Sequence, residues 1–175
     1  HPFYDGNGRT DRFISSYLLS KHLNDLIGYH ISYTIKENIH KYYDAFDICN
    51  HPLNKGDLTP FAEMFLNLID ISMKQLYDEI KSRLDKFNFY GDLCPGLPNA
   101  NNKDIEKLYY VLIQAALFSE DGISQKELEG FLNASYSSVR NKLSYIPDEL
   151  LIKNTRDRHA YYMLDLDKVD MMFSK

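Results

Sequence analysis

The sequence predicts a mainly α-helical protein that ends in a small module with a short β-hairpin. Apolar residues recur every three or four positions over most of residues 9–87, which is the period of an amphipathic helix. Residues 89–103 combine two prolines, two glycines and three asparagines, a composition typical of a connecting segment. Beyond them the pattern changes to shorter helical segments followed by two strand-like runs. The chain therefore divides into a helical domain at 1–88, a linker at 89–103 and a second domain at 104–175.

Three helices are expected in the first domain. The first spans Arg9–Leu23, and Gly28 is expected to end or interrupt it. The second runs over residues 31–49, where apolar side chains fall at steps of three and four. The third, residues 59–87, begins with a threonine N-cap and has Pro60 at its first helical position.

The second domain is expected to hold three helices and a hairpin. The first helix covers 104–118. A capping box, Ser124-Gln-Lys-Glu127, opens the next helix, and Ser135 caps the third. The apolar runs at 150–153 and 161–164 are strand-like. Helices in this order before a hairpin are typical of a winged helix-turn-helix.

Composition excludes several classes of protein. The net charge of −5 argues against a surface devoted to nucleic acid, and residues 104–175 carry nine Lys and Arg against twelve Asp and Glu. The sequence contains no run of about 18 apolar residues, the length that a membrane-spanning helix needs. Cys49 and Cys94 lie far apart without Cys-x-x-Cys spacing, so we expect free thiols in a reducing cytoplasm; a disulfide or a metal site is the alternative.

The first twelve residues, HPFYDGNGRTDR, carry the clearest chemistry. Two glycines and an asparagine tolerate positive φ, and they lie where the backbone enters a helix. Backbone N–H groups at a helix N-terminus converge on an anion, helped by the helix dipole. Two arginines three residues apart share one face and can reach polyphosphate oxygens. The expected nucleotide-binding residues are Gly6, Asn7, Gly8, Arg9 and Arg12.

Two further residues of this stretch suggest catalysis. Asp5 precedes the anion site and could hold Mg²⁺, an ion that takes one or two protein carboxylates together with phosphate oxygens. His1 titrates near neutral pH and could accept the proton of an attacking hydroxyl. A lone Gly-Asn-Gly is usually a turn and a lone histidine usually structural, but within twelve residues these separate explanations become improbable.

The stretch resembles the signature of Fic-domain proteins, HPFx(D/E)GNGRxxR, at every defined position. The segments ISYTIKENIHKYYDAF and GDLTPFAEMFLNLI are similar to those that follow the signature in that family, so the resemblance covers residues 1 to about 88. It implies a protein adenylyltransferase that uses ATP and Mg²⁺ to transfer AMP to a hydroxyl of a target protein. It further implies that His1 is the general base, Asp5 the Mg²⁺ ligand, Arg9 a phosphate contact and Arg12 a contact of the terminal phosphate.

Family members carry further helices, and a β-hairpin that clamps the target, before the signature. The chain is therefore expected to be the C-terminal part of a longer protein and to be at best weakly active alone. Its first helix is expected to expose apolar side chains, which favours self-association as a homodimer.

The second domain leaves two hypotheses open. Arg140, Lys142, Arg156 and Arg158 could contact DNA or a protein partner. The alternative function is a DNA-binding regulator in which the Fic part senses nucleotide or modifies the regulator itself. Protein recognition or dimerisation by the winged helix is the competing interpretation, favoured by the acidic balance of this domain.

Overall fold

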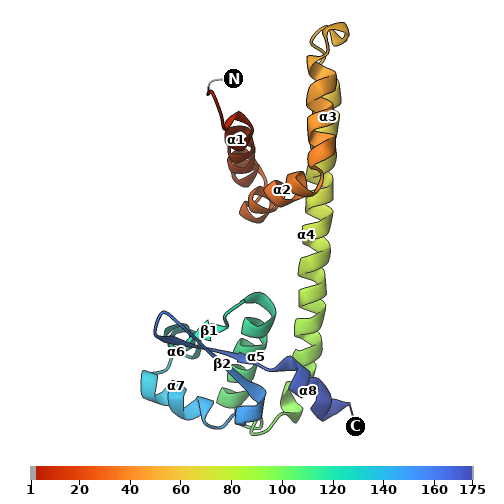
Figure 1. Ribbon diagram of the computed structural model, residues 1–175. Helices are drawn as coiled ribbons and strands as arrows, with labels where there is room; N and C mark the ends of the chain where they lie inside the picture. The colour runs from red at the N-terminus through yellow and green to blue at the C-terminus, as the bar shows by residue number, and fades with distance from the viewer. Residues whose placement is uncertain (1–2, 175) are drawn as a thin grey trace. The chain divides into compact units, whose positions relative to one another are not determined.

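Helices make up most of the computed structural model, which describes residues 3–174 and contains one small antiparallel sheet (Figure 1). The predicted mainly α fold with a short hairpin is confirmed. Contacts divide the chain into two units, residues 1–81 and 82–175, and each unit has a hydrophobic core. Within the described part of the chain, no helix is both long and apolar enough to cross a membrane.

The first unit begins with α1 (Asn7–His22), α2 (Asp25–Glu37) and α3 (Ile39–Asn50). The prediction of a single helix over residues 31–49 was wrong, because the helix is interrupted at Asn38 and two helices form instead. The backbone N–H of Asn38 bonds to the carbonyls of Thr34 and Ile35, which closes α2. The apolar period continues across this break, so periodicity alone could not reveal it.

Gly28 was expected to end or interrupt the first helix, and this expectation was wrong, because Gly28 lies inside α2. It marks the closest approach of α1 and α2. A Cβ atom at Gly28 would lie 2.7 Å from the carbonyl oxygen of Ser16 and 2.7 Å from the Cβ of Ser20. The glycine is therefore required by close helix packing.

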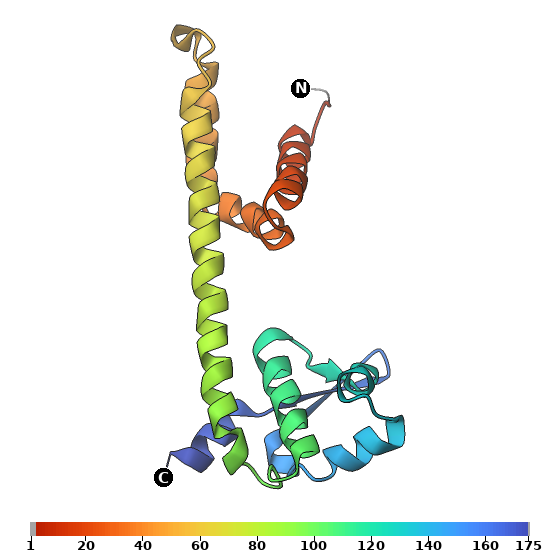
Figure 2. The same cartoon turned by 180° about the vertical axis from the view of Figure 1, so that it is seen from behind.

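Helix α3 packs beside the first part of α4 (Thr59–Leu93), as both face-on views show (Figures 1 and 2). Aromatic rings form the contact: Phe46 lies 4.6 Å from Phe61, and Tyr42 lies 5.1 Å from Phe46, between ring centroids. The fully buried members of this core are Ile31, Ile35, Tyr42 and Leu68.

Helix α4 begins at the expected residue, but its cap and its last residue differ from expectation. It begins at Thr59, whose backbone N–H donates to Oδ1 of Asp57 at 2.9 Å, so Asp57 supplies the cap expected of Thr59. It continues past residue 87 to Leu93. The following Cys94 and Leu97 are buried in the core of the second unit, so much of the expected linker belongs to that unit. Whether residues 1–88 and 104–175 act as separate domains stays a prediction.

The second unit is built around α5 (Lys103–Phe118), whose Leu108, Tyr109, Leu112 and Ile113 are all fully buried. Helices α6 (Gln125–Leu132) and α7 (Tyr136–Leu143) follow. Both predicted caps are confirmed: Ser124 and Glu127 bond reciprocally in a capping box, and Ser135 accepts from the backbone N–H of Ser138.

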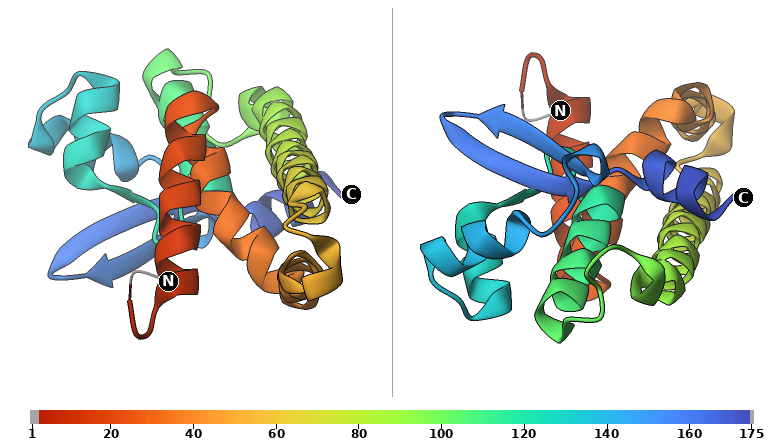
Figure 3. Two further views of the ribbon diagram at one scale, coloured as in Figure 1. Left: turned by 90° about the horizontal axis from the view of Figure 1, so that it is seen from above. Right: turned by 90° about the horizontal axis from the view of Figure 1, so that it is seen from below.

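The sheet of the second unit has the antiparallel order β1-β3-β2. Its strands are β1 (Ile123–Ser124), β2 (Leu151–Arg156) and β3 (His159–Leu164), and Figure 3 shows β2 and β3 side by side. Asp157 and Arg158 both have positive φ, as the two-residue turns that suit hairpin twist require. Strand β1 and the last helix, α8 (Leu166–Phe173), were not expected from the sequence.

Candidate functional site

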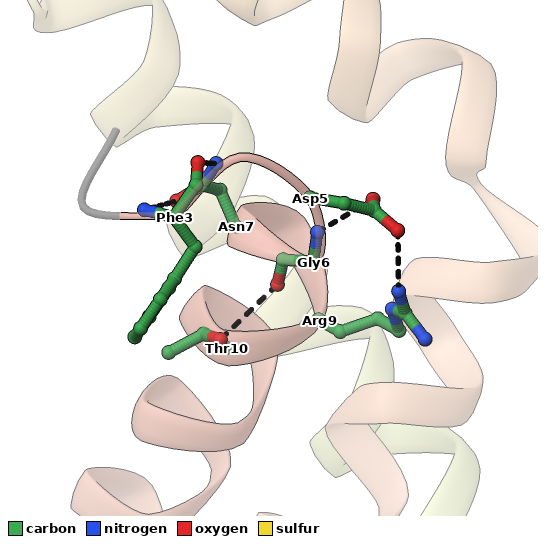
Figure 4. Close-up of polar contacts among 6 residues, drawn as sticks. All are labelled: Phe3, Asp5, Gly6, Asn7, Arg9 and Thr10. Carbon is green, nitrogen blue, oxygen red and sulfur yellow. Dashed lines mark hydrogen bonds and ion pairs between the residues drawn. The ribbon is translucent and has the colours of Figure 1, made fainter.

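The loop that enters α1 is held by its own side chains (Figure 4). Gly6 adopts the left-handed conformation, with φ of 85°, at the N-cap of α1, and no side chain caps the helix there. Asn7 bonds twice to Phe3: its Oδ1 accepts from the backbone N–H of Phe3 at 3.1 Å, and its Nδ2 donates to the Phe3 carbonyl at 2.6 Å. Asn7 thus closes the loop, while the helix end lacks a side-chain partner, as an anion-binding site requires.

The predicted Mg²⁺ ligand and the first predicted phosphate contact meet each other. Arg9 Nη2 lies 3.1 Å from Oδ2 of Asp5, and Oδ1 of Asp5 accepts from the backbone N–H of Gly6 at 2.6 Å (Figure 4). Both side chains are exposed, 92% for Asp5 and 73% for Arg9. Exposed ion pairs contribute little to stability, so phosphate and a cation can displace this one at little cost.

Arg12 is the most unusual group of the site. Its Nη1 atom is inaccessible to solvent and has no hydrogen-bond partner among the described residues. A buried donor without an acceptor carries a desolvation penalty, which an anionic ligand would relieve. The same atom lies 3.5 Å from where a Cβ would stand on Gly8, so this guanidinium lies against the loop that enters α1.

A pocket of about 450 Å³ gathers the predicted residues in one place. A second pocket, of about 490 Å³ between α1 and α2, shares Arg9 and Arg12 with it, so both arginines face the same region as predicted. The residues that line the first pocket are Tyr4, Asp5, Gly6, Asn7, Gly8, Arg9, Arg12 and Tyr43. His1, the predicted base, lies outside the described residues.

One polar contact of this region was not expected from the sequence. The hydroxyl of Tyr42 donates to Oδ2 of Asp11 at 2.7 Å and so joins α3 to α1. Burial, followed by the hydrogen bond to Asp11, raises the pKa of Tyr42 well above its usual range. A single signal was available beforehand: Asp11 is an acidic residue placed between two arginines of an anion-binding motif.

The structure separates the four predicted contacts of the second unit into two groups. Lys142 Nζ lies 2.5 Å from Oδ2 of Asp104 and lowers the pKa of that carboxyl, and Arg156 pairs with Asp121. Both of these cations therefore have an acidic partner within the unit. Arg140 and Arg158 are exposed.

The comparisons with known proteins agree with the motif. Two relatives, the protein adenylyltransferases Fic of Aedes aegypti and of Culex quinquefasciatus, are each 41% identical to this chain over 62 residues. The match covers 35% of this chain and 11% of each relative, so the chain spans about a tenth of the length of these relatives. No protein-family model matches, and no solved structure matches at a significant level. The chain therefore contains a Fic-related region.

Proposed function

We propose that residues 1–12 form the nucleotide site of a protein adenylyltransferase, which transfers AMP from ATP to a hydroxyl of a target protein. The observation that carries this proposal is the buried Nη1 of Arg12, which has no hydrogen-bond partner in the described part of the chain and lies beside a loop that leads into a helix N-terminus. The 62-residue similarity to proteins named as Fic adenylyltransferases supports it independently.

The binding residues have distinct roles in this proposal. The backbone N–H groups of Gly6, Asn7 and Gly8 meet the oxygens on which negative charge grows during transfer, and the N–H of Gly6 exchanges its bond to Asp5 for one to phosphate. Arg9 and Arg12 hold the outer phosphates, and Arg12 gains the acceptor that its Nη1 atom lacks. Because Asn7 fixes the loop before ATP arrives, little reorganisation is needed on binding.

The transfer of AMP needs no reactant beyond ATP and the target hydroxyl. The target hydroxyl oxygen forms a bond to the α-phosphorus, the bond from the α-phosphorus to the bridging oxygen breaks, and pyrophosphate leaves in line. The hydroxyl proton passes to the imidazole of His1, acting as general base.

Asp5 fits the role of Mg²⁺ ligand. Its carboxylate is exposed, and within residues 3–174 it is held by Arg9 and by the backbone N–H of Gly6. No group of three or more His, Cys, Asp or Glu residues within 3–174 could hold a metal ion, which fits an ion bound largely through ATP phosphates. When bound there, Mg²⁺ would neutralise charge on the leaving pyrophosphate.

The test is to incubate the protein with ATP labelled on either the α- or the γ-phosphate, in the presence of Mg²⁺. We expect the α label, and not the γ label, to become attached to protein, and we expect His1→Ala to remove at least about 99% of this transfer, since general bases contribute on the order of a hundredfold or more. Attachment of the γ label would instead indicate phosphate transfer. Label that persists in His1→Ala would contradict the role of His1.

DNA binding by the second unit is a second candidate, favoured by its order of helices and hairpin and by the exposed Arg140 and Arg158. The internal pairing of Lys142 and Arg156 favours a protein partner instead. Fluorescence anisotropy with duplex DNA separates the two. Affinity that falls steeply with salt and is lost in Arg140→Ala and Arg158→Ala would support a DNA-binding regulator.

A further inference from the structure

We propose that Asp11 and Tyr42 form a positioning pair, which holds the first turns of α1, and with them the anion-binding residues, in place against α3. This inference rests on the proposed function, since it concerns the same site. Neither residue needs to touch the nucleotide: the pair acts through the backbone of α1.

Packing fixes the position of the Tyr42 hydroxyl. The Tyr42 side chain is 2% exposed, and its ring contacts Phe46 and Phe61 edge-on, with centroids 5.1 and 5.9 Å away. Its hydroxyl donates to Asp11 at 2.7 Å. A hydrogen bond from such an immobilised donor to a charged acceptor is stronger than a bond between two neutral groups.

Helix α1 needs such a contact. It buries none of its residues, so apolar packing holds it less firmly than its neighbours. Among the described residues, two side-chain hydrogen bonds join α1 to other helices. Ser16 bonds to Ser32 at 2.9 Å in the middle of α1, and Asp11 bonds to Tyr42 within its first two turns. The second bond is therefore the one near the anion site.

The bond to Tyr42 also keeps the carboxylate of Asp11 out of the two pockets that Arg12 lines. Asp11 precedes Arg12 in sequence, but the two side chains line different pockets. Asp11 and Tyr42 line a pocket of about 550 Å³ on the α3 side of α1, whereas Arg12 lines the pockets next to the loop and α2. A carboxylate released from Tyr42 could turn toward Arg12 and compete with phosphate.

The test measures the affinity of the protein for inorganic tripolyphosphate by isothermal titration calorimetry. Tyr42→Phe and Asp11→Ala are each expected to weaken binding about tenfold, the size of one lost charged hydrogen bond. The double variant is expected to be no weaker than either single variant, because both changes remove the same interaction. Asp11→Asn keeps an acceptor for the hydroxyl and is expected to stay within about threefold of wild type. Tyr77→Phe and Asp78→Asn, exposed on α4, are the matched controls and should bind as wild type does.

Whether Asp11→Ala weakens or strengthens tripolyphosphate binding shows whether Asp11 acts by positioning α1 or only through its charge. If Asp11 acted only through its charge, removing it would strengthen binding of an anion, and that result would overturn the proposal. Additive losses in the double variant, or no binding of tripolyphosphate by wild type, would overturn it as well. Failure of the proposed function would look different. The protein would then bind tripolyphosphate in a way that depends on Asp11 and Tyr42, but it would transfer no AMP. Since Asp11 is exposed, its variants should fold even if Tyr42→Phe does not.

Discussion

At the scale of single residues, Gly6 and Asn7 give the loop before α1 its form. Gly6 takes a left-handed conformation that costs other residues about 1 kcal/mol or more. Asn7 then bonds to both backbone polar groups of Phe3. The loop is therefore ordered by local contacts, and its helix end stays open to a ligand.

The two cysteines should differ in reactivity. Cys94 is fully buried, and burial raises the pKa of its thiol to about 12, whereas Cys49 is half-buried. At pH 8 we expect a thiol reagent to modify Cys49 in the folded protein and Cys94 only after unfolding. Since the thiol of Cys94 is favoured in the folded state, its contribution to stability is complete below its unfolded pKa of 9.0 and declines as pH rises through about 12.

The control for this prediction is Cys49→Ser, which should leave no thiol that reacts in the native protein. The stability effect is followed by urea unfolding of wild type and Cys94→Ala between pH 8 and pH 10.5. Equal rates of modification at both cysteines under native conditions would contradict the buried position of Cys94.

At this scale the sequence predicted contacts between residues close together in the chain, but not contacts between residues far apart. Ser124 and Glu127 of the capping box lie three positions apart, so spacing was enough to predict their bonds. The proposed anion-binding residues likewise lie within a few positions of one another, so the sequence alone was enough to propose them as one site. The bond between Asp11 and Tyr42 joins residues 31 positions apart, and only the packing of α1 against α3 creates it. The partners of Lys142 and Arg156 were missed for the same reason.

At the scale of elements, helix boundaries decide where the site lies. Mainly helical structure and the hairpin followed from periodicity, but two helix boundaries did not. The break at Asn38 was missed because apolar spacing continues across it. The extension of α4 to Leu93 was missed because the prolines, glycines and asparagines of residues 89–103 indicated a connecting segment. The short α2 that results brings Gly28 against α1. This contact and the Asp11–Tyr42 bond set the position of the helix that carries the motif.

Gly28→Ala should therefore destabilise the first unit. The new methyl group would meet Ser16 and Ser20 at 2.7 Å, and overpacking of this kind costs about 1–3 kcal/mol. Thermal unfolding followed by circular dichroism should show a midpoint lowered by several degrees. Gly130→Ala is the control, since a Cβ there has no atom within 4 Å, and it should raise stability by about 0.5 kcal/mol. Equal midpoints for the two variants would contradict the close contact of α1 and α2.

At the scale of the whole molecule, α1 presents an apolar face to solvent. Phe13 is 72% exposed and Tyr17 54%, and Ile14 and Leu18 are also exposed. Contiguous apolar surface of this kind is typical of an interaction site.

We expect the chain to self-associate through this face. Analytical ultracentrifugation should show a mass that rises with concentration in the micromolar range, and Phe13→Ser combined with Tyr17→Ser should keep the protein monomeric. Phe131→Ser, which removes an aromatic side chain that is 56% exposed on α6, is the matched control. Dissociation by Phe131→Ser alone would place the interface in the second unit instead.

The most direct test of the account is a titration of the ¹⁵N-labelled protein with ATP and Mg²⁺, followed through backbone amide resonances. The account predicts that the largest shifts fall on Gly6, Asn7 and Gly8, together with the side-chain Nε of Arg12, and that Arg12→Ala weakens binding about tenfold or more. Shifts confined to other residues, or an affinity unchanged in Arg12→Ala, would contradict the assignment of this loop as the nucleotide site.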